Sequence, residues 1–209
     1  PVHDIRKDEV AHHMEQTHRR AKTQYDYHHQ AYDQHKWVLF PIIQWGLYPD
    51  LRQISAEYLS QLAPDGIAIG GLSVGETNEE MYQILDELNP HLPDDTPRYL
   101  MWVGTPADLR EAIYRGIDMF DCVMPTRIGR HGSAFTSKGT IKLSAARYKQ
   151  DFSSLEPACH CHTCHNFTKA YLHHLIKENE MLWASLLSLH NIAFLSLEIE
   201  KIKQEILES

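Results

Sequence analysis

Residues 98–123 read RYLMWVGTPADLREAIYRGIDMFDCV, and this stretch decides the fold. Its apolar run at 98–103 leads into a helical pattern at 106–115, and a second apolar run follows at 118–123. Short apolar runs bounded by turn residues are typical of buried strands, and the longer segment between them is typical of a helix. Two strands joined through a helix form a parallel βαβ unit with a right-handed crossover.

The same alternation extends toward the N-terminus. Apolar runs at 37–44 and 66–71 precede helical patterns at 50–62 and 78–88, although Pro41 is awkward inside the first run. Four βα units fit half of a (β/α)8 barrel better than a whole domain. The sequence therefore predicts an α/β fold, the C-terminal half of such a barrel.

Three further segments complete the outline. Residues 4–34 are polar, rich in His and free of Pro and Gly, which predicts an exposed helix. Residues 133–143 are typical of a small hairpin that turns at Ser137-Lys138-Gly139. Residues 166–207 form a long helical pattern with room for one break.

A cluster of cysteines lies between the hairpin and the last helical stretch. Cys159, Cys161 and Cys164 read Cys-His-Cys-His-Thr-Cys, and His190 follows in an apolar helical segment. Clustered thiolates with one distant imidazole suit a closed tetrahedral Zn²⁺ site, which holds structure and does no chemistry. Free thiols or a disulfide are the alternatives, although Cys-x-Cys is too short for an easy bridge. The residues alone leave the fourth ligand open, because other histidines lie nearby: His160, His162, His165, His173 and His174.

The cluster also suggests where the chain divides. We predict a partial barrel with the last four strands at residues 1–128. A zinc-binding subdomain with the C-terminal helices then covers residues 129–209.

Functional residues of a (β/α)8 barrel lie at the C-terminal ends of its strands. These ends carry Gln44, Gly71 with Leu72, Met101 and Asp121. An amide suits a base edge, a glycine admits a ligand close to the backbone, and a thioether packs on an aromatic ring. A carboxylate in an apolar strand needs a partner or a task, because its unpaired burial is costly. Strand-end packing for Gln44 and Met101, and a structural hydrogen-bonded carboxylate for Asp121, remain alternatives.

Charge is unevenly distributed along the chain. The net charge of −8 argues against nucleic acid as an average, but residues 127–149 carry six cations and no Asp or Glu. Such a segment is the footprint of phosphate-backbone contacts, and a solvated basic face without a partner is an equal alternative. No apolar run approaches ~20 residues, so no transmembrane helix is expected. Clustered cysteines without a secretion signal fit a reducing cytoplasm.

Four motifs together resemble the tRNA-guanine transglycosylase family, and they occur in the family's order. They are Gly70-Gly71-Leu72-Ser73-Val74-Gly75-Glu76, Arg98-Tyr99-Leu100-Met101, residues 116–127 (GIDMFDCVMPTR), and the set Cys159, Cys161, Cys164 and His190. The resemblance covers nearly the whole chain and is weakest at residues 1–36. It implies a (β/α)8 barrel with a zinc subdomain. It also implies a homodimer that exchanges guanine at tRNA wobble position 34 for the queuosine precursor preQ1, a 7-deazaguanine, in the bacterial form of the enzyme.

The resemblance also assigns roles to individual residues. Asp121 matches the nucleophile that attacks ribose C1′, and Gln44, Gly71, Leu72 and Met101 match base-pocket positions. Zn²⁺ is assigned to Cys159, Cys161, Cys164 and His190. The positions that match tRNA-contacting segments are Trp102, Val103, Gly104, Thr105, Pro106, Ala107, Asp108, Thr126, Arg127, Ile128, Gly129 and Arg130.

Two departures from the family are visible. The family's N-terminal half, with its general acid/base aspartate, is absent, so these 209 residues alone are expected to be inactive. A non-catalytic zinc-containing module that binds tRNA or serves as a dimer partner is therefore the alternative function. In addition, Trp45, Trp102 and Trp183 stand where the family usually has Gly. The first two are expected to obstruct the base pocket, and one hypothesis is a gene that reads UGA as glycine.

Overall fold

The computed structural model describes residues 6–31 and 37–208. The chain divides into two compact units. Unit 1 comprises Pro1–Val103 with Ala107–Asp121, and unit 2 comprises Gly104–Pro106 with Cys122–Ser209. The predicted domain boundary at residue 128 stays a prediction.

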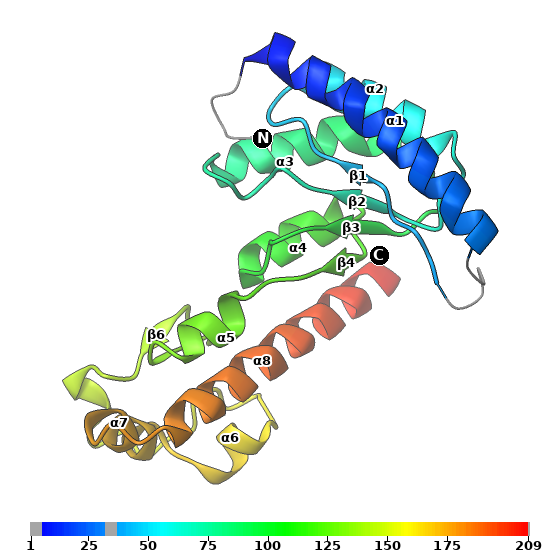
Figure 1. Ribbon diagram of the computed structural model, residues 1–209. Helices are drawn as coiled ribbons and strands as arrows, with labels where there is room; N and C mark the ends of the chain where they lie inside the picture. Colours follow the sequence, from blue (N-terminus) through cyan, green and yellow to red (C-terminus); the bar gives the residue numbers. More distant parts are fainter. Residues whose placement is uncertain (1–5, 32–36, 209) are drawn as a thin grey trace. The chain divides into compact units, whose positions relative to one another are not determined.

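Unit 1 is built on a parallel sheet of four strands, as predicted (Figure 1). The strands are β1 (Ile42–Ile43), β2 (Ile67–Ile69), β3 (Arg98–Leu100) and β4 (Met119–Phe120), and their spatial order is their order in the chain. All three residues of β2 are buried. Burial on both faces explains why this strand reads as a continuous apolar run instead of an alternating pattern.

Helices connect these strands in the predicted places. They are α2 (Pro49–Ser60), α3 (Asn78–Leu88), which a short 3₁₀ turn η1 (Asn89–His91) extends, and α4 (Pro106–Tyr114). Helix α3 begins with a capping box, in which Thr77 and Glu80 satisfy each other's backbone N–H groups. Its buried face is apolar and consists of Met81, Ile84, Leu85 and Leu88.

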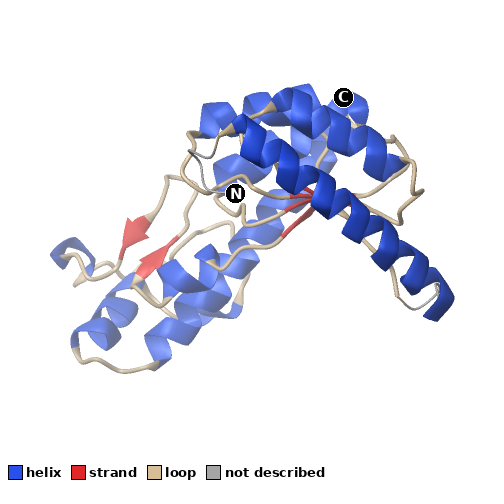
Figure 2. Cartoon of the chain, turned by 45° about the horizontal axis from the view of Figure 1, so that its top comes forward, coloured by secondary structure: helices blue, strands red, loops and turns tan. Residues whose placement is uncertain are grey.

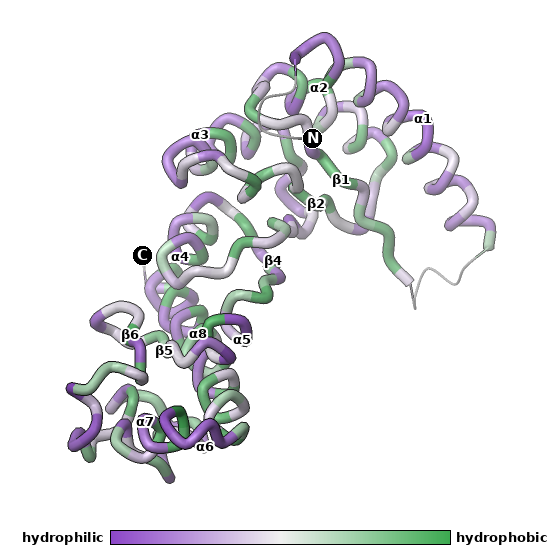
Figure 3. Tube along the Cα trace, turned by 60° about the vertical axis from the view of Figure 1, so that its left-hand side comes forward, coloured by the Kyte–Doolittle hydropathy of each residue, from purple (hydrophilic) through white to green (hydrophobic). Residues whose placement is uncertain are grey.

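The N-terminal helix α1 (Lys7–Ala31) exists as predicted, but it is not exposed all round. Val10, Met14 and His18 recur every four residues and are buried on the face that packs on α2. Figure 3 shows why the sequence obscures this face, because α1 is coloured mostly as hydrophilic. The prediction of an exposed helix is therefore wrong for this one stripe.

Unit 2 combines a hairpin with several helices (Figure 2). Its strands β5 (Ser133–Ala134) and β6 (Ile141–Lys142) are antiparallel, and Gly139 in the turn has φ +100°, which confirms the predicted hairpin. The helical elements are α5 (Met124–Gly129), η2 (Ala146–Tyr148), α6 (His162–Asn166), α7 (Lys169–Lys177) and α8 (Leu182–Leu207). The predicted break in the C-terminal helical stretch falls between α7 and α8.

Helix α8 is the central helix of unit 2. Among the described residues it is the one helix long and apolar enough to cross a membrane by length and composition, with a mean hydropathy of 1.4. The sequence expectation overlooked it because its apolar residues are interrupted by polar ones. Two of these, His190 and Asn191, are fully buried and hydrogen-bonded to the unit 2 backbone. One such helix is weak support for a membrane span, and α8 packs one side, with Leu186, Leu187 and Phe194, into unit 2.

Candidate functional site

The strand ends of unit 1 enclose a pocket of about 210 Å³. Its lining brings together the predicted residues Gln44, Gly71, Leu72 and Met101, although they come from three different loops. The remaining lining residues are Ile42, Gly70 and Trp102. A mostly apolar pocket with one amide and exposed backbone at a glycine suits a flat heterocycle with polar edges.

Asp121 lies directly after β4, and two hydrogen bonds hold its Oδ1. The Tyr99 hydroxyl donates at 2.7 Å and the Trp102 backbone N–H donates at 3.0 Å. This hydrogen bond to Asp121 raises the pKa of Tyr99 to about 12. The side chain of Asp121 is exposed, so the expectation of a buried carboxylate is wrong. The partner that the sequence argument required is present, and it fixes the carboxylate beside a pocket-lining residue.

Sequence reasoning missed Tyr99 as the partner of Asp121, because the pairing depends on the register between β3 and β4. Tyr99 pairs in register with Met119 on the neighbouring parallel strand. Asp121 follows Met119 by two positions and therefore shares its side of the sheet. The Tyr99 hydroxyl on β3 therefore reaches the carboxylate from the neighbouring strand.

Arg52 is a second residue that the sequence did not single out. It is fully buried on α2 and donates to three backbone carbonyls of the strand-end loops. Nε donates to Gly46 O at 2.7 Å, while Nη2 donates to Gly70 O at 3.0 Å and Gly71 O at 3.2 Å. Burial lowers the pKa of Arg52 to about 9, which leaves the guanidinium protonated at neutral pH. Arg52 therefore fixes the backbone that forms the pocket wall.

The three unusual tryptophans have different surroundings. Trp45 is buried in the core of unit 1, where its Nε1 donates to Ser55 Oγ at 3.0 Å. It does not line the pocket, so the expectation that it obstructs the base is wrong. Trp102 does line the pocket, and 61% of it remains exposed. Trp183 packs partly buried against the core of unit 2.

Backbone conformation sets two of these tryptophans apart. Trp45 has φ +59° and Trp102 has φ +67°. This left-handed region is natural for glycine and costs a bulky residue roughly 1–2 kcal/mol. The backbone conformation at both positions therefore suits glycine, the residue that the UGA hypothesis proposes for them.

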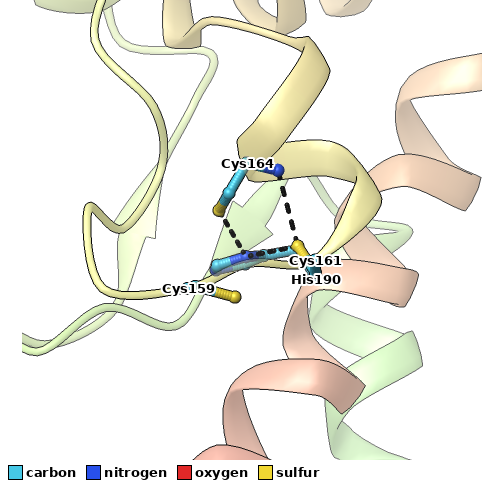
Figure 4. Close-up of side chains that lie close together, drawn as sticks. All are labelled: Cys159, Cys161, Cys164 and His190. Carbon is cyan, nitrogen blue, oxygen red and sulfur yellow. Dashed lines mark hydrogen bonds between the residues drawn. The ribbon is translucent and has the colours of Figure 1, made fainter.

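The three cysteines and His190 converge in unit 2 (Figure 4). Their ligand atoms all lie within 4.8 Å of one another. His190 Nδ1 lies 3.2 Å from Cys164 Sγ and 3.6 Å from Cys161 Sγ. His173, one of the alternative ligands, instead places Nδ1 2.7 Å from Leu143 O. The geometry thus selects His190 as the fourth member of the set.

The donor set fits a zinc ion. A tetrahedral site with Zn–S near 2.3 Å needs its ligand atoms at such mutual distances, and three thiolates with one imidazole are common structural ligands. The other ring nitrogen of His190 lies 2.9 Å from Phe135 O, which orients the imidazole. Burial raises the pKa of the Cys164 thiol to about 12 and also raises that of Cys159. A bound dication would offset this burial and hold the sulfurs as thiolates.

The pocket and the cysteine cluster occur in a chain that is similar to known proteins. The profile of the family described as "Queuine tRNA-ribosyltransferase" matches residues 1–209. The chain belongs to this family.

Two relatives illustrate the match. A protein named queuine tRNA-ribosyltransferase from Francisella tularensis subsp. tularensis (strain WY96-3418) is 54% identical over 165 residues, which is 79% of this chain and 45% of the relative. The protein of the same name from Francisella tularensis subsp. novicida (strain U112) is 56% identical over 157 residues, 75% of this chain and 43% of the relative. The chain spans about half the length of the curated relatives it matches.

The segments expected to contact tRNA are only partly accessible. Asp108 is buried and accepts from Asn78 Nδ2 at 2.9 Å and from the Tyr82 hydroxyl at 2.6 Å. Val103, Gly104 and Gly129 are also buried. Arg127 and Arg130 of α5 are exposed. In this member of the queuine tRNA-ribosyltransferase family, the two arginines are thus the best-placed candidates for phosphate contacts, which stay a prediction.

Proposed function

We propose that this chain carries the nucleophile and the base pocket of a tRNA-guanine transglycosylase. The reaction exchanges guanine at wobble position 34 of tRNA for preQ1 or a related 7-deazaguanine, in queuosine biosynthesis. The observation that carries the proposal is the pairing of Asp121, held by two donors, with a pocket lined by Gln44, Gly71 and Met101.

Asp121 begins the chemistry as an ionised carboxylate. One of its oxygens attacks ribose C1′, so that a C–O bond forms while the bond from C1′ to guanine N9 breaks. The guanine takes up a proton from a general acid that the family supplies from its N-terminal half. The incoming base then loses its N9 proton, attacks C1′ and releases Asp121. Tyr99 and the Trp102 N–H keep the attacking carboxylate oriented through both steps.

The pocket residues recognise the base before and after exchange. The Gln44 side chain offers both a donor and an acceptor to the polar edge of a purine. Gly71 has φ +65°, a backbone conformation that favours glycine, and its lack of a side chain leaves the backbone of this wall open to the ligand. Met101 supplies a polarisable surface for the ring face, and Leu72 closes the apolar side.

Zinc has a structural part in this proposal. Cys159, Cys161, Cys164 and His190 would hold the ion, which would supply a cross-link from helix α8 to α6 and the segment just before it. No step of base exchange runs through it.

The larger context also belongs to the proposal. The four parallel strands are the number expected for the C-terminal half of a (β/α)8 barrel. The family resemblance further implies a cytoplasmic homodimer, and it implies that the 209-residue chain alone does not exchange bases.

Exchange of labelled guanine into tRNA tests the catalytic assignment. The assay uses a chimera in which the N-terminal half of the Francisella relative precedes this chain. We expect exchange by the chimera, no exchange by its Asp121→Ala variant, and unchanged exchange when the exposed Asp95 is replaced by Ala. Normal exchange by Asp121→Ala would refute the assignment.

One observation favours a second candidate function. The Trp102 indole lines the pocket, where it reduces the space for a base. A chain that binds tRNA without exchange, as a module or dimer partner, would tolerate this. Equilibrium binding of preQ1 to the chimera separates the two functions, because only the enzyme needs the pocket.

The tRNA surface is tested separately. In the 209-residue chain, Arg127→Glu with Arg130→Glu should weaken binding of an anticodon stem-loop RNA and flatten its salt dependence, because phosphate contacts release counterions. The matched control replaces Lys201 and Lys203 of α8 by Glu, which changes the net charge equally outside the basic segment. Equal affinity of both double variants would show that residues 127–149 are only a solvated face.

A further inference from the structure

The segment between Pro125 and Phe135 contains most of α5, both exposed arginines and the start of the hairpin. One buried side chain of α8 holds its two ends. Asn191 is fully buried, and its Oδ1 accepts the Phe135 backbone N–H at 2.9 Å. Its Nδ2 donates to Pro125 O at 2.9 Å and to Ser133 O at 3.1 Å. A single carboxamide thus fixes backbone groups that are ten positions apart.

The neighbouring residue secures the same end of the segment. His190 Nε2 lies 2.9 Å from Phe135 O, while its Nδ1 faces the cysteine sulfurs. The N–H and C=O of Phe135 are therefore held by two consecutive residues of α8. Since Asn191 does not face the sulfurs, its contribution can be separated from metal binding.

Close packing keeps α5 against α8 between these anchors. A Cβ on Gly129 would lie 2.8 Å from the Ser188 backbone nitrogen and 3.0 Å from its Cα, which leaves no room for a side chain. The Ser188 hydroxyl also lies within 3.4 Å of Thr126 O. Helix α5 has only six residues, so these tertiary contacts, and not its own helix propensity, hold it in shape.

We propose that Asn191 is a positioning residue for tRNA binding: it holds the 125–135 segment so that Arg127 and Arg130 present their cations in a fixed geometry. This rests on the proposed function, in which those arginines contact phosphate. Asparagine suits the task because it combines one acceptor with two donors on a short stem. Without it, the Phe135 N–H and the carbonyls of Pro125 and Ser133 lose the side chain that joins them, and the segment gains freedom to move toward water.

The test compares Asn191→Ala with Thr163→Val in the zinc-loaded 209-residue chain. Thr163 is equally buried in unit 2 and donates to Leu186 O at 2.7 Å, but it does not bond to the 125–135 segment. The probe is a fluorescent anticodon stem-loop RNA titrated at several salt concentrations. We expect Asn191→Ala to bind about tenfold more weakly with a shallower salt slope, and Thr163→Val to stay within about twofold of the parent chain. Zinc content and circular dichroism are measured for both variants.

The following outcomes test the positioning role of Asn191. Parent-like affinity and salt slope in a folded, zinc-loaded Asn191→Ala chain would overturn the proposal, as would equal weakening in Thr163→Val. If Arg127→Glu with Arg130→Glu has no effect, the proposed tRNA surface fails and the positioning role fails with it. If Asn191→Ala does not fold, NMR of the unmodified chain replaces it. Bound RNA should then shift the Asn191 side-chain amide and slow exchange of the Phe135 N–H, and unchanged signals at saturating RNA would refute the role.

Discussion

Replacing Trp45 by Gly removes a buried side chain, which destabilises the fold, and relieves backbone strain, which stabilises it. The magnitudes of both effects follow from the structure. Trp45 is 4% exposed, so its removal returns nearly all of a tryptophan's buried area. That area is about 150–250 Å², worth about 4–6 kcal/mol at ~25 cal/mol per Å². Glycine at φ +59° relieves roughly 1–2 kcal/mol of backbone strain, but its greater freedom in the unfolded chain costs about 0.5–1 kcal/mol. The net expectation is a loss of about 4 kcal/mol in the free energy of unfolding.

Trp102→Gly is the matched comparison because it has the same backbone conformation without the burial. With 61% of the residue exposed, its packing contributes only about 1.5–2.5 kcal/mol. The relief of strain at φ +67° is as large as at Trp45, and it offsets most of the lost packing. With the same cost for the freedom of glycine in the unfolded chain, we expect a loss of about 1 kcal/mol in the free energy of unfolding.

Thermal unfolding followed by circular dichroism measures both variants in the 209-residue chain. Trp45→Gly should lower Tm by roughly 8–16 °C, because about 2–4 °C accompanies each kcal/mol at this chain length, and Trp102→Gly should lower it by only about 2–4 °C. A Trp45→Gly chain as stable as its parent would refute the packing argument. That result would favour glycine as the residue the gene encodes. Reading the three codons is the independent check, since UGG at all of them ends the recoding hypothesis.

Three further predictions concern the metal, the nucleophile and pH. His190→Ala should lose zinc to a chelator far faster than the parent chain and loosen unit 2, as measured by metal analysis and proteolysis; unchanged retention would exclude His190 as a ligand. Tyr99→Phe should slow base exchange by the chimera about tenfold, since a lost hydrogen bond to the Asp121 carboxylate is worth ~1.4 kcal/mol, and an unchanged rate would remove Tyr99 from the mechanism. Burial lowers the pKa of His18 below 6.5, so the folded state keeps it neutral. The free energy of unfolding of unit 1 should have its full value above pH ~6.5 and decrease as the pH falls below ~6.5. In the His18→Gln variant this decrease at acid pH should be smaller.

The strands and connecting helices were predictable because their signals are local. The three later apolar runs are bounded by Gly, Pro or Asp, and the helix starts have recognisable residues such as Thr77 with Glu80. The stripe Val10–Met14–His18 was hidden because most of its helix is polar and one stripe member is itself a histidine. The burial of His18 can be predicted only when its hydrogen-bond partner is known. That partner, Ser55, lies 37 positions away in the sequence.

The pocket residues were predictable from the rule that parallel strands end on one side of the sheet. Tyr99 and Arg52 were not singled out, for different physical reasons. Tyr99 requires the register between β3 and β4, which the sequence does not state. Arg52 is a fully buried cation, whereas the side chain of an arginine on a helix is ordinarily expected to be exposed to solvent. Its three carbonyl acceptors belong to loops that come together only after the sheet has formed.

The strand order of unit 1 has a consequence for synthesis on the ribosome. Each strand pairs with the one made immediately before it, since Ile42 pairs with Ala68, Ala68 with Tyr99, and Tyr99 with Met119. Every new strand therefore closes a loop of one βα unit, which keeps the entropic cost of closure modest. A nascent chain can add strands in the order in which they emerge, without waiting for a distant partner. Slowed translation between β2 and β3 should accordingly be tolerated better here than in a sheet whose neighbours are far apart in sequence.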